Sequence, residues 1–82
     1  MAESIEHPVR GVVARWSVEE GWGVIEAPEV PGGCWLHFSH LTGPGFRGMQ
    51  PGEAVAFTYE VLPEGAEQDG HRFRALRADP LG

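Results

Sequence analysis

The chain has 82 residues, and six arginines, no lysines and twelve acidic residues give it a formal net charge of −6. This length predicts a single domain with a modest core. The negative charge argues against a strong nonspecific grip on nucleic acid, because Lys and Arg contacts to phosphates supply that affinity. The single cysteine, Cys34, excludes an internal disulfide and favours a reducing compartment.

The first eight residues, MAESIEHP, are polar and end in a proline, so we expect a flexible N-terminus. A basic segment followed by an apolar one, which would indicate a signal peptide, does not occur there. No apolar run approaches the ~20 residues of a membrane span. These features predict a cytoplasmic protein that does not contact a membrane.

Five short strands are predicted after this terminus, over residues 9–16, 22–27, 34–38, 53–62 and 71–78. In the clearest, EAVAFTYEVL, an apolar side chain recurs at every second position, as expected for a strand with one buried face. Those apolar positions are Val55, Phe57, Tyr59 and Val61. Turns rich in Gly and Pro separate the strands, with at most one helical turn near residues 39–41. The pattern predicts an all-β domain over 9–79, folded as a small closed or nearly closed barrel, and a C-terminal tail over 80–82.

Several segments carry a resemblance to a known family. GVVARWSVEEGWGVI (11–25) resembles the opening of a bacterial cold-shock domain, whose pattern is Gly-x-Val-Lys-Trp-Phe-Asn-x-x-Lys-Gly-Phe-Gly-Phe-Ile. CWLHFS (34–39) resembles the second signature of that family, Val-Phe-Val-His-Phe-Ser. GPGF (43–46) and PGEAVAF (51–57) are similar to two further family motifs in the same order. The resemblance covers about residues 9–78 and implies a five-stranded antiparallel barrel of the OB-fold type.

The resemblance also implies that one barrel face binds single-stranded RNA or DNA through rings that stack on bases. Stacking tolerates any sequence and contributes about 1–3 kcal/mol per base. We expect the Trp22 and Trp35 rings to stand outward as a platform, with Gly21 and Gly23 giving bases room to approach. The candidate nucleic-acid-binding residues are Arg15, Trp16, Trp22, Val24, Trp35, His37, Phe38, Phe46 and Arg47. In its Gly-rich loop, Phe46 is either an anchor for the loop or a clamp on the ligand.

Departures from the family pattern reduce the expected affinity rather than the fold. The family pair Lys-Trp is Ala14-Arg15 here, although Arg15 can still stack through its guanidinium plane. A second family lysine is Glu20, which reverses a charge beside the platform. One stacking Phe is replaced by Val24, and we expect Trp16 to recover part of the lost area.

Other candidate chemistry is weaker. Cys34, His37 and His40 have a spacing like that of metal ligands, but Cys34 and His37 should point to opposite faces of a strand, and no fourth ligand is evident. We therefore expect no metal and assign Cys34 to the core. Ser39 next to His40 lacks a third group to orient a nucleophile–base pair, so we expect neither an enzyme nor a cofactor.

Half of the arginines lie close together, at Arg72, Arg74 and Arg77. We favour a solvated face on which they pair with the acidic loop residues Glu64, Glu67 and Asp69 over a track that binds phosphates. Arg72 and Arg74 should share one face, whereas Arg77 should point the other way unless a bulge intervenes.

The predicted function is binding of single-stranded RNA or DNA by stacking, with a role as an RNA chaperone or as a regulator of transcription or translation. The alternative is a diverged OB barrel whose exposed Trp patch binds a protein or a second copy of the chain. The acidic charge and the absence of lysine favour that alternative.

Overall fold

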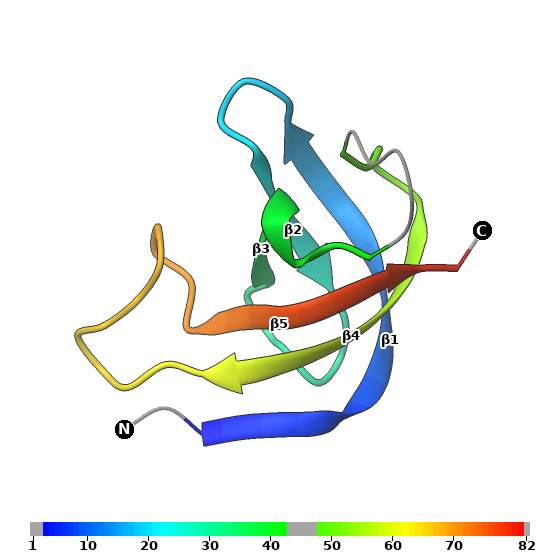
Figure 1. Cartoon of the computed structure of the whole chain (residues 1–82). Helices are drawn as coiled ribbons and strands as arrows, with labels where there is room; N and C mark the ends of the chain where they lie inside the picture. The colour runs from blue at the N-terminus through cyan, green and yellow to red at the C-terminus, as the bar shows by residue number, and fades with distance from the viewer. Residues whose placement is uncertain (1–2, 43–47, 82) are drawn as a thin grey trace.

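A computed structural model of the chain describes residues 3–42 and 48–81. The predictions for Phe46 and Arg47 lie outside these residues. The elements are β1 (Glu3–Ser17), β2 (Trp22–Glu26), β3 (Cys34–His37), the 3₁₀ turn η1 (Phe38–His40), β4 (Ala54–Val61) and β5 (Phe73–Pro80). They form a closed barrel in the order β1-β2-β3-β5-β4 (Figure 1). This confirms the predicted five-stranded β-barrel and the helical turn after the third strand.

One strand pair differs from the expected antiparallel arrangement. Four pairs are antiparallel, whereas β3 and β5 run parallel through Cys34–Phe73 and Trp35–Arg74. In a closed ring with an odd number of strands, directions cannot alternate all the way round, so one pair must be parallel. Within the described part of the chain, no helix is long and apolar enough to cross a membrane.

The first strand corrects the expectation of a flexible N-terminus for residues 3–8. β1 begins at Glu3, pairs with β4 from Glu3–Val61 onward, and packs Ile5 against the core. Pro8 cannot donate a backbone hydrogen bond, and it lies in the irregular stretch between Ile5 and Val9 where the register shifts. Figure 1 shows β1 bending, so that one half runs beside β4 and the other beside β2.

The barrel interior is filled from alternating positions, as predicted. Val13, Ile25, Leu36, Val55 and Phe57 are each at most 1% exposed. A second set of apolar residues, partly or fully buried, completes the core cluster around them. Regular alternation then turns the remaining residues of β2 and β3 toward the outside of the barrel.

Cys34 belongs to this core, as predicted. It is completely buried, and burial raises the pKa of its thiol from 9.0 to about 12. His37 lies on the other face of β3, so these two residues of the metal-like spacing do not converge.

A bulge in β5 decides where the C-terminal arginines point. Arg74 faces Glu60 and Arg77 faces Thr58 on β4, with the register shift between them. The extra residue places Arg74 and Arg77 on the same outer face, which the sequence allowed only with a bulge. For Arg74 and Arg77 the expected ion-pair partners were wrong, because Arg74 pairs with Glu60 and Arg77 with Asp79. The loop residue Glu67 has a pKa lowered by backbone hydrogen bonds, and the charge of Arg72 helps to lower it.

Candidate nucleic-acid interface

The outer face of β2 and β3 gathers most of the predicted stacking residues. Trp22 pairs with His37 across the two strands, and Val24 pairs with Trp35. The ring centroids of Trp22 and Trp35 are 5.7 Å apart, those of Trp35 and His37 are 5.8 Å apart and nearly parallel, and those of His37 and Phe38 are 4.7 Å apart. These four rings form one continuous surface, which we call the aromatic strip.

Exposure along the aromatic strip is uneven. Phe38 is 51% exposed and Trp22 and His37 are half-buried, but Trp35 is only 9% exposed and Val24 only 4%. Alternation with the core residues Cys34 and Leu36 turns Trp35 outward, yet its ring is not the open platform that was expected. Trp22 and His37 flank it on the same outer face. The accessible rings of the strip are Trp22, His37 and Phe38.

Two buried polar atoms at the aromatic strip have no hydrogen-bond partner among the described residues. They are Nε1 of Trp35 and Nδ1 of His71, whose ring meets the Trp22 ring edge-on at 6.4 Å. An unsatisfied buried donor costs about 1–3 kcal/mol. The strip is therefore less favourably packed than the core beneath it.

Hydrogen bonds fix the orientation of two imidazoles at the end of β3. The backbone N–H of Ser39 donates to Nδ1 of His37, so the neutral ring carries its proton on Nε2. The carbonyl of Leu76 can only accept, so Nδ1 of His40 donates to it at 3.2 Å and Nε2 is left as an acceptor. The two imidazoles thus present a donor and an acceptor respectively.

The glycines beside the aromatic residues do not serve the purpose that we predicted. A Cβ at Gly21 would lie 3.0 Å from the Phe38 ring. A Cβ at Gly23 would lie 2.5 Å from the Trp16 ring and closer still to the carbonyl oxygen of Arg15. These glycines make room for neighbouring atoms of the protein itself rather than for bases.

Trp16 lines the same hollow as Trp22 and Arg15, but it packs differently from the rings of the aromatic strip. It pairs with Gly23, which in turn faces the core residue Leu36, and its ring packs partly buried against the core. Its indole nitrogen would also lie 2.5 Å from a Cβ at Gly48. Trp16 is thus half-buried beside Trp22, and the expectation that it recovers part of the stacking area lost at Val24 stays a prediction.

Within residues 3–42 and 48–81, charges around the aromatic strip nearly balance. Arg15 pairs with Val24 and is exposed at one edge, where it lines a small hollow together with Trp22 and Glu20. At the opposite edge, Nε of Arg74 donates to Oε2 of Glu60 at 2.6 Å, and Nη2 contacts the same oxygen. Phosphates near the strip would therefore meet few uncompensated cations.

Sequence reasoning missed several neighbours of Trp35. A groove of about 420 Å³ beside it is lined by His40, Glu60, Gln68 and Arg74, and the His71 ring meets the Trp22 ring edge-on. These residues come from η1, β4, β5 and the loop before β5. Local patterns in the sequence carry no signal for this convergence, because it depends on the parallel pairing of β3 and β5.

Comparison with known proteins supports the family suggested by the sequence. No protein-family model matches the chain. Cold shock-like protein CspE of Bacillus anthracis is 40% identical over 52 residues, which are 61% of this chain and 73% of that protein. The major cold shock protein of Micrococcus luteus is 30% identical over 57 residues (70% and 85%), and the probable cold shock protein A of Mycolicibacterium smegmatis is 27% identical over 63 residues (77% and 94%). With these similarities and its closed five-stranded barrel, the chain belongs to the cold-shock protein family.

Proposed function

We propose that the chain binds single-stranded RNA or DNA by stacking bases on the accessible rings of the aromatic strip. As a member of the cold-shock protein family it is a binding protein rather than an enzyme. The observation that carries the proposal is the unbroken run of Trp22, Trp35, His37 and Phe38 on one outer face. Trapping unpaired strands in this way would allow an RNA-chaperone role.

Stacking supplies most of the proposed affinity, because the local charges nearly cancel. With about one to three phosphates neutralised, the slope of log K against log salt would be roughly −0.7 to −2. Affinity should be modest and should change little between low and physiological salt. A strongly basic single-strand binder would show a much steeper slope.

Titration of intrinsic Trp fluorescence with short oligo-dT and oligo-U at two salt concentrations tests the proposal. Binding should weaken by about 5- to 150-fold in Phe38→Ala, because stacking contributes about 1–3 kcal/mol per base. Phe38 is 51% exposed, so this variant should fold normally. Val18→Ala, at an 80% exposed turn residue outside the strip, is the matched control and should bind like the wild type. Absence of binding to either oligonucleotide at low salt would overturn the proposal.

The alternative function, in which the Trp patch binds a protein or a second copy, stays a prediction. The near-complete cover over Trp35 reduces the exposed indole surface that such a patch would offer. Analytical ultracentrifugation over a hundredfold range of concentration tests self-association directly. A dimer that Phe38→Ala abolishes would favour this alternative over the proposed function.

A further inference from the structure

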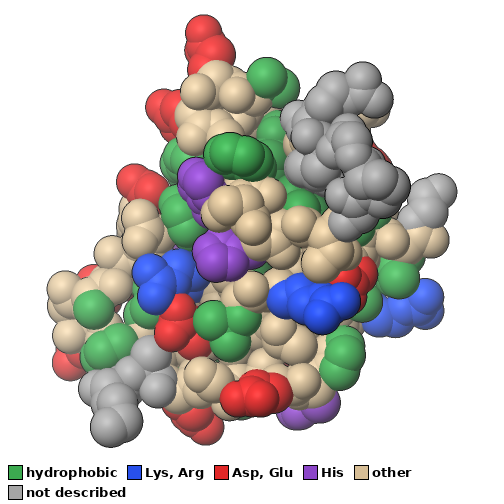
Figure 2. All heavy atoms as spheres, viewed as in Figure 1, with side chains coloured by type: hydrophobic (Ala, Val, Ile, Leu, Met, Phe, Trp, Pro, Cys, Tyr) green, Lys and Arg blue, Asp and Glu red, His purple; other side chains and the backbone are tan. Residues whose placement is uncertain are grey.

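A polar groove lies directly beside the aromatic strip. Trp35 borders it from β3, Arg74 from β5, Glu60 from β4 and His40 from η1. Its volume of about 420 Å³ is within the range of small-ligand sites. Figure 2 shows imidazoles side by side at the centre of one face, with basic and acidic side chains next to each other nearby.

Strand register places the groove residues in one row across the barrel. Val24 pairs with Trp35 and Trp35 with Arg74. Arg74 in turn pairs with Glu60. Neighbouring strands are about 4.8 Å apart. A base that stacks on the accessible rings and reaches past Trp35 would therefore bring its edge over Arg74 and Glu60.

The charges of the groove disfavour a phosphate. Both contacts from Arg74 go to Oε2 of Glu60, so the Glu60 carboxylate compensates the guanidinium charge. A phosphate bound to Arg74 would lie beside a carboxylate of the same sign. A neutral group rich in donors and acceptors meets no such repulsion.

Hydrogen-bonding capacity remains on both partners of this ion pair. The contacts to Arg74 use one oxygen of Glu60, which leaves Oε1 to accept from a ligand. The Arg74 side chain is 39% exposed, and the guanidinium carries five N–H donors in a fixed plane. His40 adds an acceptor through Nε2. A planar ligand whose edge carries both donors and acceptors fits this set, and a nucleobase is such a ligand.

We propose that the groove beside Trp35 binds one nucleobase by its edge, with Glu60 and Arg74 as the residues that determine which base is preferred. This inference rests on the proposed function and adds base selectivity to it. Hydrogen bonds to a base edge discriminate between bases, whereas stacking does not. The chain therefore binds single strands of any sequence with a preference at one nucleotide.

Binding of dT heptamers that carry one dA, dC or dG at each position in turn tests the inference, by fluorescence anisotropy at two salt concentrations. We expect the wild type to prefer one base by about fivefold or more at a single position. The double variant Glu60→Val/Arg74→Val keeps the net charge at −6 and should reduce the preference below twofold without changing the salt slope.

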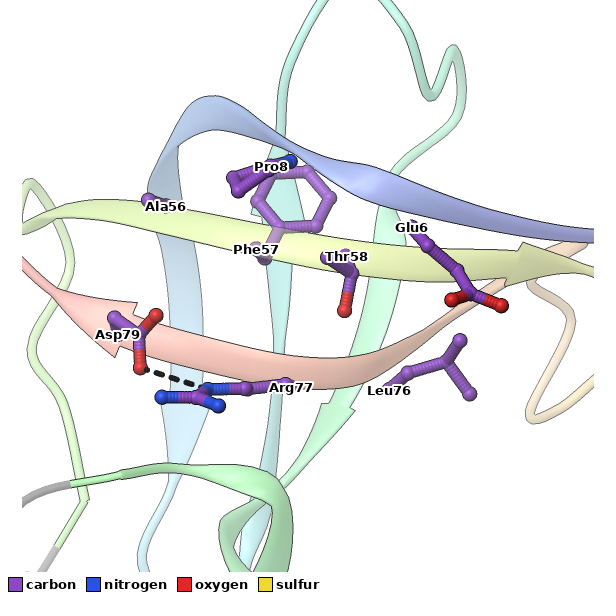
Figure 3. Close-up of a pocket in the computed structure, with 8 residues that line it drawn as sticks. All are labelled: Glu6, Pro8, Ala56, Phe57, Thr58, Leu76, Arg77 and Asp79. Carbon is purple, nitrogen blue, oxygen red and sulfur yellow. Dashed lines mark hydrogen bonds and ion pairs between the residues drawn. The ribbon is translucent and has the colours of Figure 1, made fainter.

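The matched control is Asp79→Val/Arg77→Val, which removes the other ion pair of β5. That pair lines a separate hollow between β1, β4 and β5 (Figure 3) and should leave the base preference intact. Arg74→Lys keeps the charge but loses the planar fork, so it should lower the preference even if the double variant folds poorly.

Several results would overturn the inference. One is equal binding of all heptamers by the wild type, and another is an unchanged preference in both groove variants. A salt slope that becomes shallower by about 0.7 in the double variant, with the preference retained, would assign Arg74 to a phosphate instead. No binding of any heptamer by the wild type would overturn the proposed function as well.

Discussion

Replacing Trp35 by Phe should leave the barrel as stable as the wild type or make it more stable by up to about 2 kcal/mol. Two effects oppose each other at this 9% exposed side chain. The smaller ring buries roughly 40 Å² less apolar surface, which costs about 1 kcal/mol at 25 cal/mol per Å². The change also removes the buried Nε1–H that has no partner among the described residues, which returns about 1–3 kcal/mol.

Urea unfolding followed by far-UV circular dichroism measures this difference in stability. Trp fluorescence is less suitable, because the substitution itself removes one of the fluorescent side chains. Trp35→Ala should lose about 3–5 kcal/mol, because it leaves a cavity. Trp22→Phe is the matched control. Its indole nitrogen is not among the buried unpartnered atoms, so this variant should lose only a few tenths to about 1 kcal/mol. A loss of more than about 1.5 kcal/mol in Trp35→Phe would show that the indole N–H is hydrogen-bonded in solution, and would refute the reasoning.

Three further changes test the charge, the packing and the buried thiol. Glu20→Lys, beside Trp22, should tighten oligo-dT binding about fivefold at 0.1 M salt and steepen the salt slope by about 0.7. The control Glu6→Lys, in the hollow of Figure 3, should change the affinity and the salt slope much less. Equal effects of the two variants would contradict an electrostatic effect that is local to the strip. Gly23→Ala should cost about 1–3 kcal/mol and lower the melting temperature by several degrees, because its Cβ would collide with the Arg15 carbonyl oxygen and the Trp16 ring. Gly52→Ala would meet no described atom within 4 Å but has a φ of +94°, so it measures backbone strain alone, which Gly23 does not carry. An unchanged melt in Gly23→Ala would contradict the packing. The free energy of unfolding should fall by up to about 1.4 kcal/mol per pH unit above pH 9, because the Cys34 thiol ionises there in the unfolded chain, while burial holds its pKa in the folded protein at about 12. Cys34→Ala should lack this contribution. An identical dependence of the unfolding free energy on pH in both proteins would contradict the prediction.

Alternation along single strands was predictable from the sequence, and it located most of the core. In β4 the buried positions Val55, Phe57 and Tyr59 follow the period of two that the sequence displays. The same alternation predicted that Ile25 and Leu36 point inward, and therefore that Trp22 and Trp35 point outward. Parity is a property of one strand, so it needs no knowledge of what that strand packs against.

Exposure of the outward rings was not predictable in the same way. A strand pattern gives the direction of Trp35, but it does not show that Trp22 and His37 flank its ring on the same outer face. The expectation of a flexible terminus was wrong for residues 3–8, for a related reason. The polar segment around Glu3 pairs with β4 through its backbone, and backbone pairing leaves no signature in side-chain polarity.

The row of Trp35, Arg74 and Glu60 depends on barrel closure, which the sequence does not display. The parallel pairing of β3 with β5 and the bulge near Arg77 set its register. The sequence raised the possibility of a bulge without locating it, so it placed the arginine cluster only in general terms. Ion-pair partners followed the actual register, at Glu60 and Asp79, instead of the acidic loop.

The net charge of −6 says less about binding than its distribution does. Fields from exposed charges are screened within about 8–10 Å at physiological salt, so acids elsewhere on the barrel contribute little at the aromatic strip. Among the described residues around the strip, Arg15 shares a hollow with Glu20, and Arg74 pairs with Glu60. Such a balanced surface neither attracts nor strongly repels a phosphate backbone. Ring area and base-edge hydrogen bonds then decide affinity, which is how an acidic barrel without lysine can still bind single strands.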